Sequence, residues 1–273
     1  MNRLIVLAVV VWSAVLLAGA GEGAKKVEWV AHRGESYLAP ENTMAAYNLG
    51  WRGNVDADET DIQLTKDGKV IICHDLDTLR TTGTKLIIKD STLDQLRALD
   101  AGSWKDAKFA GEKLPVLSEL LASIPDNKRV FVEIKSGIDV VPEAVKVIKD
   151  SGKKPEQIAL ISFREDALAA AKKALPEYKT YFLSGFKQDK KSKEWTPKIA
   201  DLIKIARNNG FDGLDLQNKP PFDGDAVKQI KDAGLNAYVW TVDDPAQAKQ
   251  YIQWGIDGIT TNRAAWLREQ CGK

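Results

Sequence analysis

Short β-branched segments alternate with amphipathic segments along nearly the whole chain from residue 28 onward. A helical pattern follows the strand-like segments, such as VPEAVKVIKDSG at residues 141–152 or PAQAKQYIQWG at residues 245–255. This alternation is typical of parallel α/β folds, because a helical crossover must return the chain to the start of the next parallel strand. Eight segments have the pattern of strands: EWVAHRG, ADETDIQLT, RVFVEIK, IALISF, KTYFLSG, FDGLDLQ, NAYVWTV and IDGITTN.

The number of strands and the length of the chain favour a closed barrel. A chain of 273 residues with 44% hydrophobic content suits one (β/α)8 barrel. Residues 210–214 and 255–259 form a faint repeat that leads from a helix into a strand, as successive barrel units do. A doubly wound sheet competes, but neither of its common phosphate-binding glycine motifs is present. We therefore predict an α/β fold, a TIM barrel over residues 27–270.

The segment between the second and third predicted barrel strands is too long for an ordinary loop. It is polar, and it contains the turn signal TTGT and the short helical pattern TLDQLRALD. Loops beyond roughly 12–15 residues usually carry function or structure of their own. We therefore expect a small insertion at about residues 76–115. The charged segment at residues 187–193 is instead typical of a solvated loop near the barrel mouth.

The first 20 residues have the pattern of a signal peptide. Arg3 precedes an apolar run from Leu4 to Leu17, and small residues follow at positions 18–20. The run is shorter than the roughly 20 residues that span a bilayer, which argues against a stable membrane anchor. The sequence thus predicts export of the mature chain to the periplasm or the medium.

Charge and cysteine content exclude some classes of partner. The formal net charge is +1, and removal of the predicted signal peptide would make it zero. A neutral chain gives no reason to expect binding to nucleic acid or to an anionic membrane, since both require a positive field. The two cysteines, Cys73 and Cys271, permit one disulfide but do not imply it.

Carboxylates cluster where two of the predicted strands end. Strand alternation places Glu59 and Asp61 on one face of ADETDIQLT, and Glu133 and Lys135 on the interior face of RVFVEIK. Three crowded carboxylates repel one another unless a cation neutralises them, and all-oxygen ligands suit Mg²⁺ or Ca²⁺. A network of ion pairs with Lys135 is the alternative interpretation.

The chain has only two histidines, His32 and His74, and each one closes an apolar strand beside these carboxylates. A single histidine at such a position is more often a hydrogen-bonded structural residue. Two of them at equivalent positions instead predict a pair that transfers protons near neutral pH. Cys73 points to the opposite face from His74, so it is not expected in the same site.

The strings HRGESYLAPENTMAAYNLG, ETDIQLTKDGKVIICHD and LRTTG resemble the signature of the glycerophosphodiester phosphodiesterase family. The resemblance continues through LRALDAGSW, GEKLPVLSELL, VEIK, YVWTVDD and GIDGITTNRAAW, so it covers nearly the whole mature chain. It implies a barrel with a small insertion after the second strand. It also implies hydrolysis of small-molecule glycerophosphodiesters to sn-glycerol 3-phosphate and an alcohol.

Carried over position by position, the resemblance also implies roles for single residues. It implies Glu59, Asp61 and Glu133 as ligands of a divalent metal ion, Ca²⁺ or Mg²⁺, and His32 and His74 as general acid and base. Arg33 and Lys135 match residues that contact phosphate, and Trp240 matches an apolar wall of the pocket. Which histidine is the acid stays open, as do the head group and the oligomeric state.

Some positions have a second interpretation. Strict alternation turns Arg33 away from the face of His32, so its role requires the chain to leave strand geometry at Gly34. Trp240 also suits the core. The pair Asp243 and Asp244 is expected to cap the next helix.

Two alternative functions share this barrel. One is a related phospholipase D-type lipid phosphodiesterase. Such an enzyme needs an apolar surface that faces the membrane, and no Trp or Leu cluster in the sequence indicates one. The other is a catalytically inactive barrel that binds phosphates or sugar phosphates, against which the complete set of polar residues argues.

Overall fold

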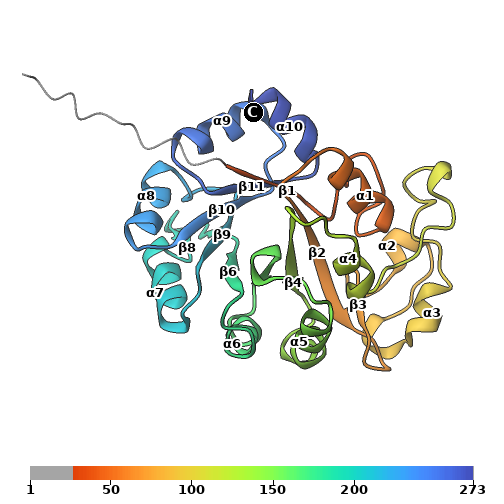
Figure 1. Cartoon of the computed structure of the whole chain (residues 1–273). Coiled ribbons are helices and arrows are strands. Elements are labelled where there is room, and N and C mark those ends of the chain that lie inside the picture. The colour runs from red at the N-terminus through yellow and green to blue at the C-terminus, as the bar shows by residue number, and fades with distance from the viewer. Residues whose placement is uncertain (1–26, 273) are drawn as a thin grey trace, which may run out of the picture.

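The computed structural model describes residues 27–272, and the predicted signal peptide lies outside them. Eight parallel strands close into a barrel in the order β1-β2-β4-β5-β6-β9-β10-β11, and β11 pairs back with β1. Helices lie outside the strands (Figure 1), so the predicted (β/α)8 TIM barrel is confirmed. The barrel strands are β1 (Glu28–Ala31), β2 (Ala57–Leu64), β4 (Arg129–Ile134), β5 (Ile158–Ser162), β6 (Lys179–Ser184), β9 (Gly213–Gln217), β10 (Asn236–Trp240) and β11 (Gly258–Thr261).

Polar side chains start several of the surrounding helices. Thr43 caps α1 (Met44–Arg52) by accepting a hydrogen bond from the Ala46 N–H. Asp244 caps α9 (Pro245–Gln253) in the same way, so the predicted capping role is right for Asp244 alone. The other helices are α2 (Leu79–Thr82), α3 (Leu93–Arg97), α4 (Leu117–Ser123), α5 (Val141–Asp150), α6 (Glu165–Ala174), α7 (Ile199–Asn209), α8 (Gly224–Asp232) and α10 (Ala264–Gln270), with single 3₁₀ turns at Ile88–Asp90, Ala107–Phe109, Ile138–Val140 and Pro155–Gln157.

The predicted insertion after the second barrel strand is also present. It begins before the predicted start at about residue 76, with β3 (Val70–Ile72), which runs antiparallel to β2. It continues through α2 and α3 at the side of the barrel (Figure 1). Its own apolar cluster includes Cys73 and Ile88. Cys73 is therefore a core residue, and it and Cys271 are both free thiols.

The segment at residues 187–193 is more structured than the predicted solvated loop. It belongs to a short hairpin in which β7 (Lys187–Gln188) pairs antiparallel with β8 (Trp195–Thr196). Most of its side chains are exposed, as expected for a charged segment.

Strand alternation separates two apolar layers. Side chains such as Val130, Val132 and Ile134 pack outward in the large cluster that includes the helices. Phe131, Tyr181 and Tyr238 instead fill the barrel interior, with ring centroids 4.7–5.8 Å apart. These rings occupy the interior below the C-terminal ends of the strands, which leaves that end for polar side chains. Among the described residues, no helix is long and apolar enough to cross a bilayer.

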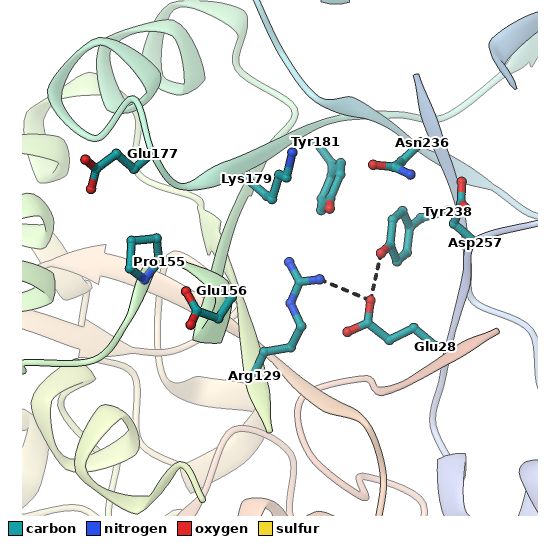
Figure 2. A pocket seen from close by; sticks show the side chains of 10 residues that line it. All are labelled: Glu28, Arg129, Pro155, Glu156, Glu177, Lys179, Tyr181, Asn236, Tyr238 and Asp257. Carbon is teal, nitrogen blue, oxygen red and sulfur yellow. Dashed lines mark hydrogen bonds and ion pairs between the residues drawn. The ribbon is translucent and has the colours of Figure 1, made fainter. Parts of the chain in front are cut away.

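The N-terminal end of the barrel carries its own polar network. Arg129 Nη1 lies 3.3 Å from Glu28 Oε2, and the Tyr238 hydroxyl donates a 2.7 Å hydrogen bond to the same oxygen. Figure 2 shows these side chains converging in a cavity of about 510 Å³. Glu28 and Arg129 are the first residues of β1 and β4. Because this end of a TIM barrel serves stability rather than chemistry, we interpret the network as structural.

Candidate active site

Three carboxylates meet at the opposite end of the barrel. Glu59 and Asp61 share one face of β2, and Asp61 lies in register with Glu133 on the adjacent strand β4. One ligand oxygen from each residue lies within 4.8 Å of the other two, and all three side chains are buried. The structure therefore brings together the three carboxylates that the sequence assigned to a metal ion.

Two cations border this carboxylate cluster. Arg33 Nε lies 3.3 Å from Asp61 Oδ2, and Lys135 Nζ lies 3.0 Å from Glu133 Oε1. The ion pairs considered as an alternative are thus present, but two cations do not balance three carboxylates. In the described part of the chain, moreover, no group hydrogen-bonds Asp61 Oδ1. The excess negative charge and the all-oxygen donor set fit a hard divalent cation.

Burial and crowding disfavour negative charge on two of the carboxylates. Burial and the neighbouring acids Asp61 and Glu133 raise the pKa of Glu59 well above its usual value. Burial and Asp61 raise the pKa of Glu133 to about 8. Burial acts in the same direction on Asp61, but Arg33, His74 and Lys135 outweigh it and lower the pKa of Asp61. A bound divalent cation would favour the ionised form of all three.

The hydrogen bonds of His32 define its tautomer. His32 Nδ1 lies 2.7 Å from Asn262 Oδ1, while Asn262 Nδ2 donates a 2.6 Å hydrogen bond to Asp243 Oδ2. Because a carboxylate only accepts, it fixes the orientation of the amide, and Nδ1 must carry the proton. Burial and the charge of Arg33 lower the pKa of His32 to about 4, so the ring is neutral near neutral pH. Asp243 acts on this site through Asn262 and does not cap α9.

His74 has a different hydrogen-bond partner from His32, the carboxylate of Asp75, which is not among the predicted site residues. His74 Nδ1 lies 2.7 Å from Asp75 Oδ1, and Arg80 Nε donates to Asp75 Oδ2 at 2.6 Å. Burial raises the pKa of Asp75, but the hydrogen bonds from Arg80 and His74 outweigh it and lower this pKa to about 2. The carboxylate at Nδ1 fixes the orientation of the His74 ring, as the carboxylate of a catalytic triad does.

Arg33 reaches the cluster because the chain leaves strand geometry after β1. Its φ is +58°, and that of Gly34 is +76°. The Arg33 N–H donates a 3.0 Å hydrogen bond to Glu59 Oε2, while its guanidinium binds Glu41. The departure expected at Gly34 thus begins one residue earlier. At Gly34 a side chain would overlap Ala46 of α1, so the tight turn requires glycine there.

A cavity of about 130 Å³ opens beside the carboxylates. Trp240 stands in its wall with its ring edge-on to Phe163, at a centroid distance of 5.5 Å. Every predicted site residue except Asp61 lines this cavity, and Asp61 lies within the carboxylate cluster. The lining residues are His32, Arg33, Glu59, His74, Glu133, Lys135, Ile161, Phe163, Leu183, Asp215, Trp240 and Thr260.

Several polar residues around the cavity were not predicted. Asn42 Nδ2 donates a 2.8 Å hydrogen bond to Asp61 Oδ2, and Glu41 accepts hydrogen bonds from Arg33 and Arg80. The segment Pro-Glu-Asn at residues 40–42 carried a signal for both, because it is polar and follows the first strand. Asn262 also follows a strand end directly. Asp215 carried a similar signal, as a lone acid between two leucines of a strand.

A second cavity of about 470 Å³ adjoins the first and shares Lys135 with it. Exposed apolar side chains lie on segments that follow strand ends, and three of them line the cavities: Leu76 and Ile87 the larger one, and Phe163 the smaller one. We call all of these exposed side chains the apolar rim: Tyr37, Leu38, Leu76, Leu79, Ile87, Ile138 and Phe163. These residues could not be predicted to lie near the site, because they are far apart along the chain.

Fold and geometry together define a class of protein. The chain is an α/β barrel whose C-terminal end holds a candidate cation site, two histidines with fixed partners and a small adjoining cavity. Residues 32–265 match the model of the glycerophosphoryl diester phosphodiesterase family. The chain belongs to this family and is a glycerophosphodiester phosphodiesterase, a phosphoric diester hydrolase.

Individual relatives agree with this assignment. The chain is 33% identical to a glycerophosphodiester phosphodiesterase of Caldanaerobacter subterraneus, covering 85% of this chain and 93% of the relative. It is 30% identical to one of Bacillus subtilis, covering 85% and 82%. Among solved structures, a phosphodiesterase of Oleispira antarctica in complex with the product sn-glycerol-3-phosphate has a TM-score of 0.79 and 26% identity, covering 90% and 97%.

Proposed function

We propose that this enzyme hydrolyses glycerophosphodiesters to sn-glycerol 3-phosphate and an alcohol, with a divalent cation at Glu59, Asp61 and Glu133. The observation that carries the proposal is the buried carboxylate cluster between His32 and His74, open to a cavity beside it. Complexation of the product by the Oleispira antarctica relative supports the choice of product.

The cation is Mg²⁺ or Ca²⁺ in this proposal, because the three ligands offer only oxygen. When bound, it would neutralise charge on the phosphate oxygens. Arg33 and Lys135 border the same cavity and hold the phosphate from two sides with fixed positive charge. Trp240 forms the apolar wall against which the rest of the substrate lies.

The two histidines take different roles because their partners differ. His32 is neutral and keeps its Nε2 lone pair free, so it accepts the proton of the nucleophile. The nucleophile is either water or the glycerol 2-hydroxyl, which would form a cyclic phosphate that water then hydrolyses to glycerol 3-phosphate. His32 already serves as the base, and His74 is held at Nδ1 by the ionised Asp75. It therefore donates a proton to the departing alcohol oxygen.

The test is incubation of the purified mature chain with glycerophosphocholine and Mg²⁺ or Ca²⁺, with and without chelator. We expect glycerol 3-phosphate to appear only with the metal ion. Replacement of either histidine by alanine should lower kcat by about 10²- to 10⁴-fold. Glu59→Gln should raise the metal concentration needed, whereas Asp58→Asn, at the neighbouring buried carboxylate outside the site, should not. Metal-independent turnover, or full activity of both histidine variants, would refute the mechanism.

We also propose that the chain is exported, to the periplasm or the medium. Residues 1–20 support this by their signal-peptide pattern. Amino-terminal sequencing of the protein recovered from the periplasmic and culture fractions should give a chain that starts after Ala20. Recovery of the intact amino terminus from the cytoplasm would contradict export.

The apolar rim favours a second candidate, a phospholipase D-type activity on lysophospholipids. Leu76 is 70% exposed and lines the larger cavity. Exposed apolar side chains at a binding cavity often mark a site of contact with lipid or protein. Choline release from lysophosphatidylcholine should be compared with release from glycerophosphocholine. If lipid is a substrate, Leu76→Ser should lower kcat/KM for the lipid alone; an equal effect on both would exclude a lipid role for the rim.

A further inference from the structure

One wall of the active-site cavity contains a buried acid that the proposed mechanism does not use. Asp215 lies on β9 between Leu214 and Leu216, which pack outward in the core, so its own side chain faces the barrel interior. It is only 2% exposed. Across the described residues, no group hydrogen-bonds its Oδ1.

The nearest side chains on the adjoining wall do not donate a hydrogen bond to the Asp215 carboxyl group. Leu183, its register partner on β6, lines the same cavity and is apolar. The Trp240 indole N–H is already used, because it donates a 3.1 Å hydrogen bond to the main-chain oxygen of Asp215. A buried carboxyl oxygen without a partner costs stability. Each unsatisfied group of this kind calls for an explanation, and a ligand in the adjoining cavity would supply one.

The position of Asp215 in the barrel decides which part of a bound substrate its carboxyl group can contact. Around the barrel, β9 is four strands away from β2, and therefore on the opposite side from Glu59 and Asp61. The phosphate belongs on the side of those carboxylates, with Arg33 and Lys135. An acid on the opposite wall is a poor partner for phosphate but a good one for a hydroxyl, from which it accepts a hydrogen bond.

The size of the cavity limits which part of the substrate can lie beside Asp215. Its volume is about 130 Å³. A cavity of about 150 Å³ holds benzene, which has as many heavy atoms as glycerol. The glycerol part therefore fits between the cluster and Asp215, with its C–H groups against Trp240 and Phe163. The alcohol part then extends toward the larger cavity that shares Lys135.

We propose that the Asp215 side chain binds a free hydroxyl of the glycerol moiety and thereby gives the enzyme its preference for glycerol-containing diesters. This inference rests on the proposed function. It holds for either protonation state of the carboxyl group, because an ionised acid accepts a hydrogen bond from the hydroxyl and a neutral one can also donate.

The test compares two substrates that differ only in the hydroxyls: glycerophosphocholine and n-propyl phosphocholine. The wild-type enzyme should prefer the glycerol compound by at least tenfold in kcat/KM. Asp215→Leu should reduce this preference about tenfold, mainly through a higher KM for glycerophosphocholine. Asp215→Asn, which can still form hydrogen bonds, should retain most of it. Inhibition by glycerol 3-phosphate and by n-propyl phosphate gives the comparison without turnover. This comparison decides the outcome if the glycerol 2-hydroxyl is the nucleophile, because n-propyl phosphocholine then lacks the reacting group.

Two controls separate a substrate contact from a structural role. Asp58→Asn alters a similarly buried acid outside the cavity and should leave the preference unchanged. Asp215→Leu should not lower the melting temperature, since it removes an unpaired buried acid. An active wild-type enzyme whose preference survives Asp215→Leu would overturn this inference alone. A wild-type enzyme that hydrolyses neither diester would overturn the proposed function and this inference with it.

Discussion

At the scale of single residues, the site depends on the groups that hold the two histidines. Asn262 fixes the proton of His32 on Nδ1, and Asp243 in turn fixes the Asn262 amide. The ionised carboxylate of Asp75 orients His74 through the contact with its Nδ1. The two histidines of one cavity are therefore held by different partners, a neutral amide for His32 and an ionised carboxylate for His74.

The first prediction concerns the pKa of His32. The chain has two histidines, so NMR of its imidazole groups should show two titrating signals. Burial and Arg33 disfavour the imidazolium, so one signal should titrate at about 4 instead of 6.5. Its neutral form should carry the proton on Nδ1. The signal is assigned to His32 with the His74→Gln variant, in which the signal that titrates at low pH must remain. A titration of His32 at or above the usual value would show that burial and Arg33 do not control its pKa.

At the scale of secondary-structure elements, β2 is constrained on both of its faces. Its interior face carries the metal-site acids, while Asp58 on the other face packs against Gly50 of α1. A Cβ at Gly50 would overlap the Asp58 carboxylate. The close contact of α1 with β2 therefore depends on a glycine within a helix, in spite of its low helix propensity.

The second prediction follows from this contact. Gly50→Ala should lower the free energy of unfolding by about 1–3 kcal/mol, because overpacking outweighs the gain in helix propensity. Urea denaturation measures the change. In an Asp58→Ala background, which removes the overlapping group, the same substitution should cost less or become stabilising. An equal loss in both backgrounds would show that the overlap is not the cause.

At the scale of the whole molecule, the two ends of the barrel have separate tasks. The C-terminal end gathers the carboxylates, the histidines and the cavity. The N-terminal end is closed by the ion pair of Glu28 and Arg129 with the Tyr238 hydroxyl (Figure 2). The aromatic layer of Phe131, Tyr181 and Tyr238 lies between them.

The third prediction tests this separation. Glu28→Gln should lower the free energy of unfolding by about 1–3 kcal/mol, since it leaves the charge of Arg129 without its partner in a mostly buried place. The kcat/KM for glycerophosphocholine, measured at a temperature where the variant is folded, should change less than twofold. Lys228→Ala, which breaks an exposed helical ion pair, is the matched control and should cost less than about 0.5 kcal/mol. A large loss of activity in Glu28→Gln would contradict the separation.

The barrel could be predicted because its signals are local and repeated. Strand alternation alone placed Glu59 and Asp61 on one face, and Val130 and Val132 on the other face from Glu133. The repetition of strand and helix then left few possible topologies. The hairpin at residues 187–196 was missed because two-residue strands have no periodicity to detect.

The sequence by itself determined the fold class, the family, the three carboxylates and the two histidines, because these follow from periodicity and from short motifs. Only the tertiary structure decided which groups orient the histidines, where Asp215 faces, and which exposed apolar residues line the cavities. These features depend on contacts between distant segments, such as His32 with Asn262, 230 positions apart. Such contacts form only when the barrel closes, and pairing across a closed barrel leaves no local pattern in the chain.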